Sequence, residues 1–354
     1  MMRTLLAAAA AMAMLTGLAQ AEDKLKIGFV YVGPVGDFGW TYQHDQGRLA
    51  IEKEFGDKVE TTYVENVSEG PDAERVIRQL AADGNKLIFT TSFGFMNPTV
   101  KVAERFPDVK FEHATGYKRL DNLATYSSRF YEGRYIIGQI AGRMSMSGIV
   151  GYIASFPIPE VVQGINAFML GMQSVRPDAQ LKIVWVNSWF DPGKEADAAK
   201  ALIDQGADII TQHTDSPAAM QVAEQRGVKA FGQASDMIQF GPNAQLTSII
   251  DDWSAYYIKR TRQVLDGTWT SGDVWGGLAD NMVVMAPYTN MPEDVAQMAR
   301  ETEEAIRSGR FHPFTGPIFK QNGEQAAKEG EVLSDEVLLG MNWYVKGITD
   351  TLPQ

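Results

Sequence analysis

The chain contains no cysteine. This absence excludes disulfide bridges, thiolate metal sites and a cysteine nucleophile, and it also excludes the acylated cysteine of a bacterial lipoprotein. Only four histidines are present, and none has a second histidine or a carboxylate at a spacing typical of zinc sites. The sequence therefore predicts no bound metal.

Motifs of catalysis and of cofactor binding are also missing. No Gly-x-Ser-x-Gly nucleophile elbow occurs, although His213 and Asp215 lie close together. The glycine-rich loop 33–40 has neither the spacing of a phosphate-binding loop nor that of a dinucleotide fingerprint. We therefore expect a protein that is not an enzyme and that needs no cofactor.

Basic runs and long hydrophobic stretches are scarce. The formal net charge is −12, which argues against nucleic acid or an anionic membrane as a partner. After residue 18 every apolar stretch is short and interrupted, so no later membrane span is expected.

The first 21 residues have the pattern of a secretory signal peptide. Arg3 provides the positive end, residues 5–18 are apolar, and the residues 19–21, Ala-Gln-Ala, match a cleavage site. We predict cleavage before Glu22. Together with the absence of a lipidated cysteine, this indicates a periplasmic protein.

The mature chain alternates short apolar strands with helices of about 12 residues, as in parallel α/β sheets. Strands are expected near 25–32, 59–64, 86–91, 110–113 and 124–127. The pattern restarts at strand 149–154, which predicts two similar lobes with a cleft between them. We place lobe one at 22–146 plus about 281–318, and lobe two at 147–280 plus about 319–354. Crossovers are accordingly expected near residues 146 and 280 and within 313–320.

Ligands of open parallel sheets bind beyond the carboxyl ends of the strands, so the loops there supply the candidate residues. Trp40 and Trp189 follow strands of different lobes and could stack on the two faces of a planar ring. Asp215, Asp236 and Asp251 follow other predicted strands, and a carboxylate there can accept hydrogen bonds from a ligand.

Several motifs occur in order along nearly the whole mature chain. They are Gly36-Asp37-Phe38-Gly39-Trp40, Gly94-Phe95, the segment 130–138, Ser147-Gly148-Ile149-Val150-Gly151, Ile158-Pro159-Glu160-Val161-Val162, the segment 167–171, Asp191-Pro192-Gly193-Lys194 and the segment 206–210. With these motifs the chain resembles the BMP family (basic membrane protein, or purine nucleoside receptor type) of ABC transporter substrate-binding proteins.

The resemblance implies a type I periplasmic-binding-protein fold, with two doubly wound parallel-sheet lobes, a three-segment hinge and closure on the ligand. It also implies that Trp40 and Trp189 hold a purine, that Asp236 is placed to hold ribose hydroxyls, and that a permease and a small molecule are the partners of a monomer. Asp37, Phe38 and Phe95 complete the set of ligand-binding candidates from the motifs.

The family's nucleoside binders carry a lysine where this chain has Asp251. This difference favours a free purine base, adenine first, over a nucleoside. Two alternatives remain open: a sugar-binding protein of the same fold, and a ligand sensor that acts on a membrane receptor.

Overall fold

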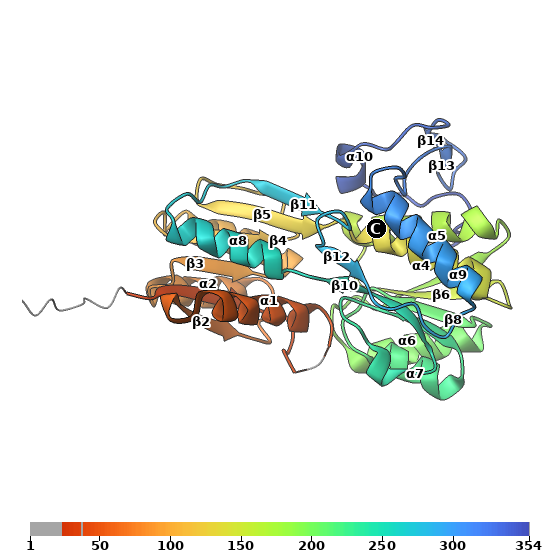
Figure 1. Ribbon diagram of the computed structural model, residues 1–354, viewed down its shortest axis with the longest axis horizontal. Helices are drawn as coiled ribbons and strands as arrows, with labels where there is room; N and C mark the ends of the chain where they lie inside the picture. Colours follow the sequence, from red (N-terminus) through yellow and green to blue (C-terminus); the bar gives the residue numbers. More distant parts are fainter. Residues whose placement is uncertain (1–22, 37, 354) are drawn as a thin grey trace, which may run out of the picture.

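Two separate six-stranded sheets form the two lobes of the computed structural model, which describes residues 23–36 and 38–353 (Figure 1). The predicted signal segment, residues 1–21, lies outside the described residues. The two-lobed α/β architecture confirms the predicted fold class.

The first sheet has the strand order β2-β1-β3-β4-β5-β11, and all of its neighbours are parallel. Its strands are β1 (Leu25–Val30), β2 (Val59–Val64), β3 (Leu87–Thr90), β4 (Lys110–Ala114), β5 (Leu123–Ser128) and β11 (Asp273–Gly276). Every residue of β3 is buried, as expected for a central strand with helices on both faces.

The second sheet repeats this plan with the order β7-β6-β8-β9-β10-β12. Its strands are β6 (Ile149–Ala154), β7 (Gln180–Trp185), β8 (Ile209–Gln212), β9 (Lys229–Gly232), β10 (Gln245–Asp251) and β12 (Val283–Met285). The last of them, β12, is antiparallel to β10, whereas the other pairs are parallel. The predicted restart at 149–154 is thus the first strand of a second sheet.

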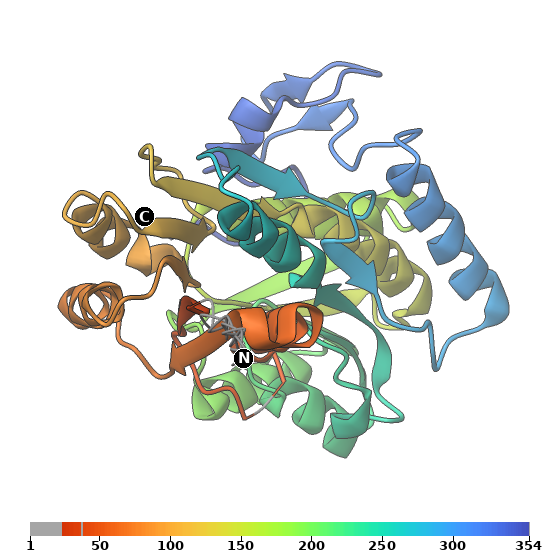
Figure 2. The same cartoon turned by 60° about the vertical axis from the view of Figure 1, so that its left-hand side comes forward.

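Helices cover both faces of each sheet (Figures 1 and 2). On the first sheet, α2 (Pro71–Ala82) and α3 (Met96–Ala103) contribute to one core, and α1 (Trp40–Phe55) and α8 (Ser254–Leu265) to the core on the other face. On the second sheet, α6 (Pro192–Asp204) and α7 (Ala218–Arg226) cover one face, and α4 (Phe130–Met144), α5 (Pro159–Val175) and α9 (Glu293–Arg307) cover the other.

The helices α4 and α5 approach each other unusually closely. A Cβ atom added at Gly138 would lie 2.2 Å from the carbonyl oxygen of Phe168, and one at Gly171 would lie 2.2 Å from that of Tyr135. Only glycine allows this backbone approach. Because α5 belongs to the second sheet, α4 is fixed to lobe two as well.

The chain crosses between the lobes three times, but not at the predicted places. It crosses between β5 and α4, between β10 and α8, and between β11 and β12. The predictions near 146, near 280 and within 313–320 put α4 and the segment 281–318 in lobe one, and α8 and β11 in lobe two. The pairing of β12 with β10 corrects this assignment, because Ile250 faces Val284 in the second sheet.

The C-terminal segment lies on lobe two, near α5 (Figure 1). It contains β13 (Ile318–Phe319), β14 (Gln325–Ala327) and α10 (Asp335–Leu339). Asn166 of α5 donates to the carbonyl of Trp343 at 2.7 Å and accepts from the amide of Val345 at 3.0 Å. In the part of the chain that the structure describes, none of the helices has the length and apolar character needed to cross a membrane.

Candidate functional site

A cavity lies between the lobes, where the carboxyl ends of strands from both sheets meet. Residues of both lobes line it, and sites between two domains are a usual place for small-molecule binding. Its lining residues are Val32, Trp40, Ser92, Phe93, Thr115 and Phe130 on one side, and Ile158, Glu160, Trp189, His213, Asp215 and Gln233 on the other.

Trp40 is the first residue of α1, and its ring is held on three sides. Its indole Nε1 donates to the carbonyl of Thr91 at 2.6 Å. The rings of His44 and Trp253 meet it at 75° and 77°, with centroids 4.4 and 5.5 Å away. Because the indole N–H is already satisfied by the protein, Trp40 offers the cavity an apolar ring.

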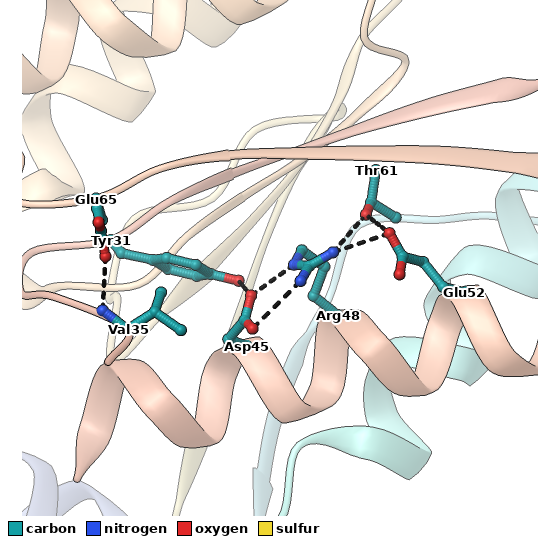
Figure 3. Close-up of polar contacts among 7 residues, drawn as sticks. All are labelled: Tyr31, Val35, Asp45, Arg48, Glu52, Thr61 and Glu65. Atoms are coloured by element: carbon teal, nitrogen blue, oxygen red, sulfur yellow. Dashed lines mark hydrogen bonds and ion pairs between the residues drawn. The ribbon is translucent and has the colours of Figure 1, made fainter. Parts of the chain in front are cut away.

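A polar network fixes α1 and the loop before it against the first sheet (Figure 3). Asp45 of α1 accepts from the hydroxyl of Tyr31 at 3.2 Å and from Nε of Arg48 at 2.5 Å. In the loop, the amide of Val35 donates to Glu65 at 2.6 Å. These bonds tie the element that begins with Trp40 to the ends of β1 and β2, so the position of its ring depends little on the ligand.

Trp189 follows β7 and brings the second indole ring into the cavity from lobe two. Its ring contacts that of Phe156, with centroids 4.7 Å apart. Its Nε1 donates to Glu69 Oε1 of lobe one at 3.1 Å, so the ring spans the mouth of the cleft. Asp191 caps the next helix, α6, because its side chain accepts from the amide of Lys194 at 3.0 Å.

Glu160, at the start of α5, and His213, after β8, form a polar pair in the cavity wall. His213 Nε2 lies 3.3 Å from Glu160 Oε1, and its Nδ1 lies 3.0 Å from the hydroxyl of Ser155. An imidazole with one ring proton donates from one nitrogen and accepts at the other. With Nε2 donating to the carboxylate, the histidine orients Glu160 and leaves its second oxygen available as an acceptor.

Two further carboxyl groups lie on the lobe-two side. Asp215 lines the cavity, and burial raises its pKa well above the usual range, with further increases from the charges of Glu195, Asp251 and Glu160. Asp251 is fully buried, and no described residue donates a hydrogen bond to either of its carboxylate oxygens. Burial likewise raises its pKa well above the usual range; Glu160 adds to the shift and Arg134 opposes it.

Because of these carboxyl groups, we expect the ligand-free protein to lose stability as the pH rises above about 4. Unfolded aspartate loses its proton near pH 3.9, whereas the buried groups keep theirs to higher pH. The folded state therefore binds more protons in this window, and raising the pH favours unfolding.

Asp251→Asn is expected to flatten this dependence, measured by urea unfolding between pH 5 and pH 8. The control is Asp197→Asn, because the Asp197 side chain is 79% exposed. An Asp251 variant with the wild-type pH dependence would show that this carboxyl group does not cause the loss of stability at higher pH.

The structure brings three of the eight predicted ligand-binding residues to the cavity, namely Trp40, Trp189 and Asp215. Asp251 is not among the lining residues and is fully buried. Asp37 lies outside the described residues. Both predicted aromatic rings therefore line one cavity from different lobes.

Three predicted residues have other surroundings. Asp236 does not line the cavity, because its Oδ1 accepts from the amide of Ile238 at 3.1 Å and from Gln245 at 2.7 Å. Phe95 is fully buried in the core beneath α2 and α3. Phe38 packs instead on Tyr42 and Phe240, with ring centroids 4.7 and 5.4 Å away.

Sequence reasoning did not propose several of the lining residues, among them Ser92, Phe93, Phe130, Glu160 and Gln233. Most of them lie within or next to loops that the strand-end rule selects. That rule identifies the loop but not the side chain that faces the cavity. It could therefore have named these residues as candidates, but it could not have separated them from their neighbours in the same loops.

Comparison with known proteins agrees with this geometry. Residues 24–310 match the family described as "ABC transporter substrate-binding protein PnrA-like". The chain is 66% identical over 341 residues to a purine-binding protein of Brucella abortus (strain 2308), with 96% of this chain and 97% of the relative covered. It is also 39% identical over 333 residues to a putative ABC transporter glucose-binding protein of Haloferax volcanii, with 94% and 82% covered.

A solved structure supports the fold. An ABC transporter solute-binding protein from Aeropyrum pernix K1 superposes with a TM-score of 0.72 at 19% identity, covering 81% of this chain and 92% of that one. Together with the family match over most of its length, this means that the chain belongs to the Bmp family of PnrA-like substrate-binding proteins of ABC transporters.

Proposed function

We propose that the protein captures a purine, with free adenine favoured, in the cavity between its lobes and delivers it to the permease of an ABC importer. In this proposal it acts in the periplasm as a monomer, after loss of residues 1–21, and does not change its ligand chemically. The proposal rests on one observation. Trp40 and Trp189 belong to different lobes and line the same cavity, whose wall also contains carboxyl groups.

The chemistry of the wall favours a flat ring that donates hydrogen bonds. Two indole rings stack well on a heterocycle. Glu160 and Asp215 offer acceptors to ligand N–H groups, and adenine presents an exocyclic amine and a ring N–H.

Two observations support a free base over a nucleoside. Asp236 is the residue expected to hold ribose hydroxyls, but its carboxylate accepts hydrogen bonds from Ile238 and Gln245 and does not line the cavity. The relative from Brucella abortus is named a purine-binding protein. The second candidate, a sugar, is favoured by the name of the relative from Haloferax volcanii, and tryptophan faces and carboxylates also suit sugars.

Removing either indole ring is expected to weaken adenine binding strongly. Losing the stack and the buried area in Trp40→Ala or Trp189→Ala should weaken binding by about 10- to 1000-fold. Calorimetry with adenine, a purine nucleoside and glucose measures the effect, and Trp343→Ala in the C-terminal segment is the control. Binding of glucose alone, or wild-type purine affinity in both variants, would overturn the purine proposal.

Two further measurements address the remaining parts of the proposal. Mass spectrometry of the small molecule released from the purified protein by mild denaturation identifies the ligand directly. Incubation with purine nucleosides should return them intact, and ribose release that His213→Ala abolishes would contradict a pure binding function.

A further inference from the structure

Glu69 of lobe one joins the two lobes at the mouth of the cavity. It lies between β2 and α2, and its Oε1 accepts three hydrogen bonds: from the hydroxyl of Ser92 at 2.6 Å, from the amide of Gly94 at 3.0 Å and from Nε1 of Trp189 at 3.1 Å. The first two donors belong to lobe one, whereas Trp189 belongs to lobe two. A single carboxylate oxygen thus connects the two walls of the cleft.

The local backbone is shaped to receive this carboxylate. A Cβ atom added at Gly94 would lie 2.2 Å from the Glu69 Cδ, so only glycine lets the carboxylate rest on the backbone amide. Ser92, which lines the cavity, holds the same oxygen. The carboxylate is therefore oriented by its own lobe and does not need the partner lobe to find its place.

We propose that Glu69 is a positioning residue, which fixes the indole ring of Trp189 over the bound ligand and keeps the cleft closed. This inference rests on the proposed binding function. When the lobes separate, the contact with Trp189 is lost, while those with Ser92 and Gly94 stay within lobe one. Because the acceptor is already oriented, little conformational entropy is lost on closure. A hydrogen bond to a charged acceptor is also stronger than one between neutral groups.

The proposal predicts a change in the rate of ligand release rather than in ligand capture. Closure follows the first encounter, so Glu69→Ala should speed adenine dissociation by about 10- to 150-fold, the range for one lost charge-assisted hydrogen bond. The association rate should change by less than about twofold, as is usual when only the bound state is affected. Stopped-flow tryptophan fluorescence measures both rates.

A double-mutant cycle with Trp189→Phe separates positioning from general stability. Phenylalanine keeps an aromatic ring but has no N–H to donate, so Glu69→Ala should have almost no additional effect on dissociation in that background. Glu74→Ala on α2 is the matched control, because Glu74 pairs with Lys101 of the same lobe, 3.3 Å away. The Glu74→Ala protein should release adenine at the wild-type rate.

The outcomes distinguish the two proposals. If wild-type protein binds glucose but no purine, the purine proposal fails and the cycle is run with glucose. The role of Glu69 is overturned if Glu69→Ala releases the bound ligand at the wild-type rate, or if its full effect persists in the Trp189→Phe background. If no compound in the panel binds, both proposals are overturned.

Discussion

Gly39→Ala is expected to abolish high-affinity ligand binding while both lobes stay folded. A Cβ atom at this position would lie 2.1 Å from the carbonyl oxygen of Asp215, which belongs to the other lobe. Real Cβ contacts of this kind do not fall below 3.0 Å, and the obstacle is backbone that cannot rotate away. The closed form is thus sterically blocked by a single methyl group.

The closed form also needs the backbone of this residue. Its amide donates to the hydroxyl of Ser235 of lobe two at 2.5 Å, and its φ of 121° and ψ of −158° lie in a region that is essentially restricted to glycine. If the binding-competent state becomes rare, the apparent affinity falls in proportion. We therefore expect a loss of about 1000-fold or more, equivalent to about 4 kcal/mol.

Calorimetry and solution scattering test this prediction together. Wild-type protein should become more compact with saturating ligand, whereas Gly39→Ala should keep its ligand-free radius. Gly36→Ala in the same loop is the control, since nothing lies within 4 Å of its added Cβ. Circular dichroism checks that the variant is folded. A Gly39→Ala protein that binds and compacts like the wild type would show that this contact does not govern closure.

Glu112→Ala is expected to destabilise lobe one by about 3–5 kcal/mol, the usual result of removing one partner from a buried ion pair. Glu112 of β4 is fully buried and accepts from Arg260 Nε at 2.5 Å, from the hydroxyl of Tyr256 at 2.6 Å and from Nε1 of Trp269 at 2.6 Å. All three donors belong to the segment that returns from lobe two. Its loss would leave the Arg260 guanidinium buried without its counter-charge.

Urea unfolding measures this loss, and the matched control is Glu54→Ala. Glu54 of α1 pairs with Arg262 of α8, the helix that also carries Arg260, but both side chains are about half exposed. Such a surface pair contributes only about 0–1 kcal/mol. Because Glu112 does not line the cavity, folded variant protein should keep its ligand affinity. A stability loss below about 1 kcal/mol would show that the buried charge is compensated in another way.

Local patterns in the sequence were enough to predict both lobes. The apolar strands near 25–32 and 149–154 begin two sheets with the same order of their first five strands. Rules for the ends of parallel strands then selected Trp40, Trp189 and Asp215, which the structure brings to one cavity. These predictions succeed because periodicity and strand-end position depend on residues that are neighbours in the chain.

The sequence did not determine which lobe each later segment joins. An apolar strand at 281–286 fits either sheet, and only its hydrogen bonds with β10 place it in lobe two. The glycines that let α4 approach α5 assign α4 to lobe two for a similar reason. Strand pairing and close helix contacts join distant segments, and no local pattern encodes them.

The same distinction applies to single side chains in the site. The sequence placed Asp236 after a strand, but the local turn directs its carboxylate to Ile238 and Gln245. It gave no sign that Glu69 would meet Trp189, 120 residues further along the chain. Composition and pattern determined the fold class, the family and two aromatic walls of the cavity. The tertiary structure alone decided which carboxylates face it, because that depends on how the two lobes meet.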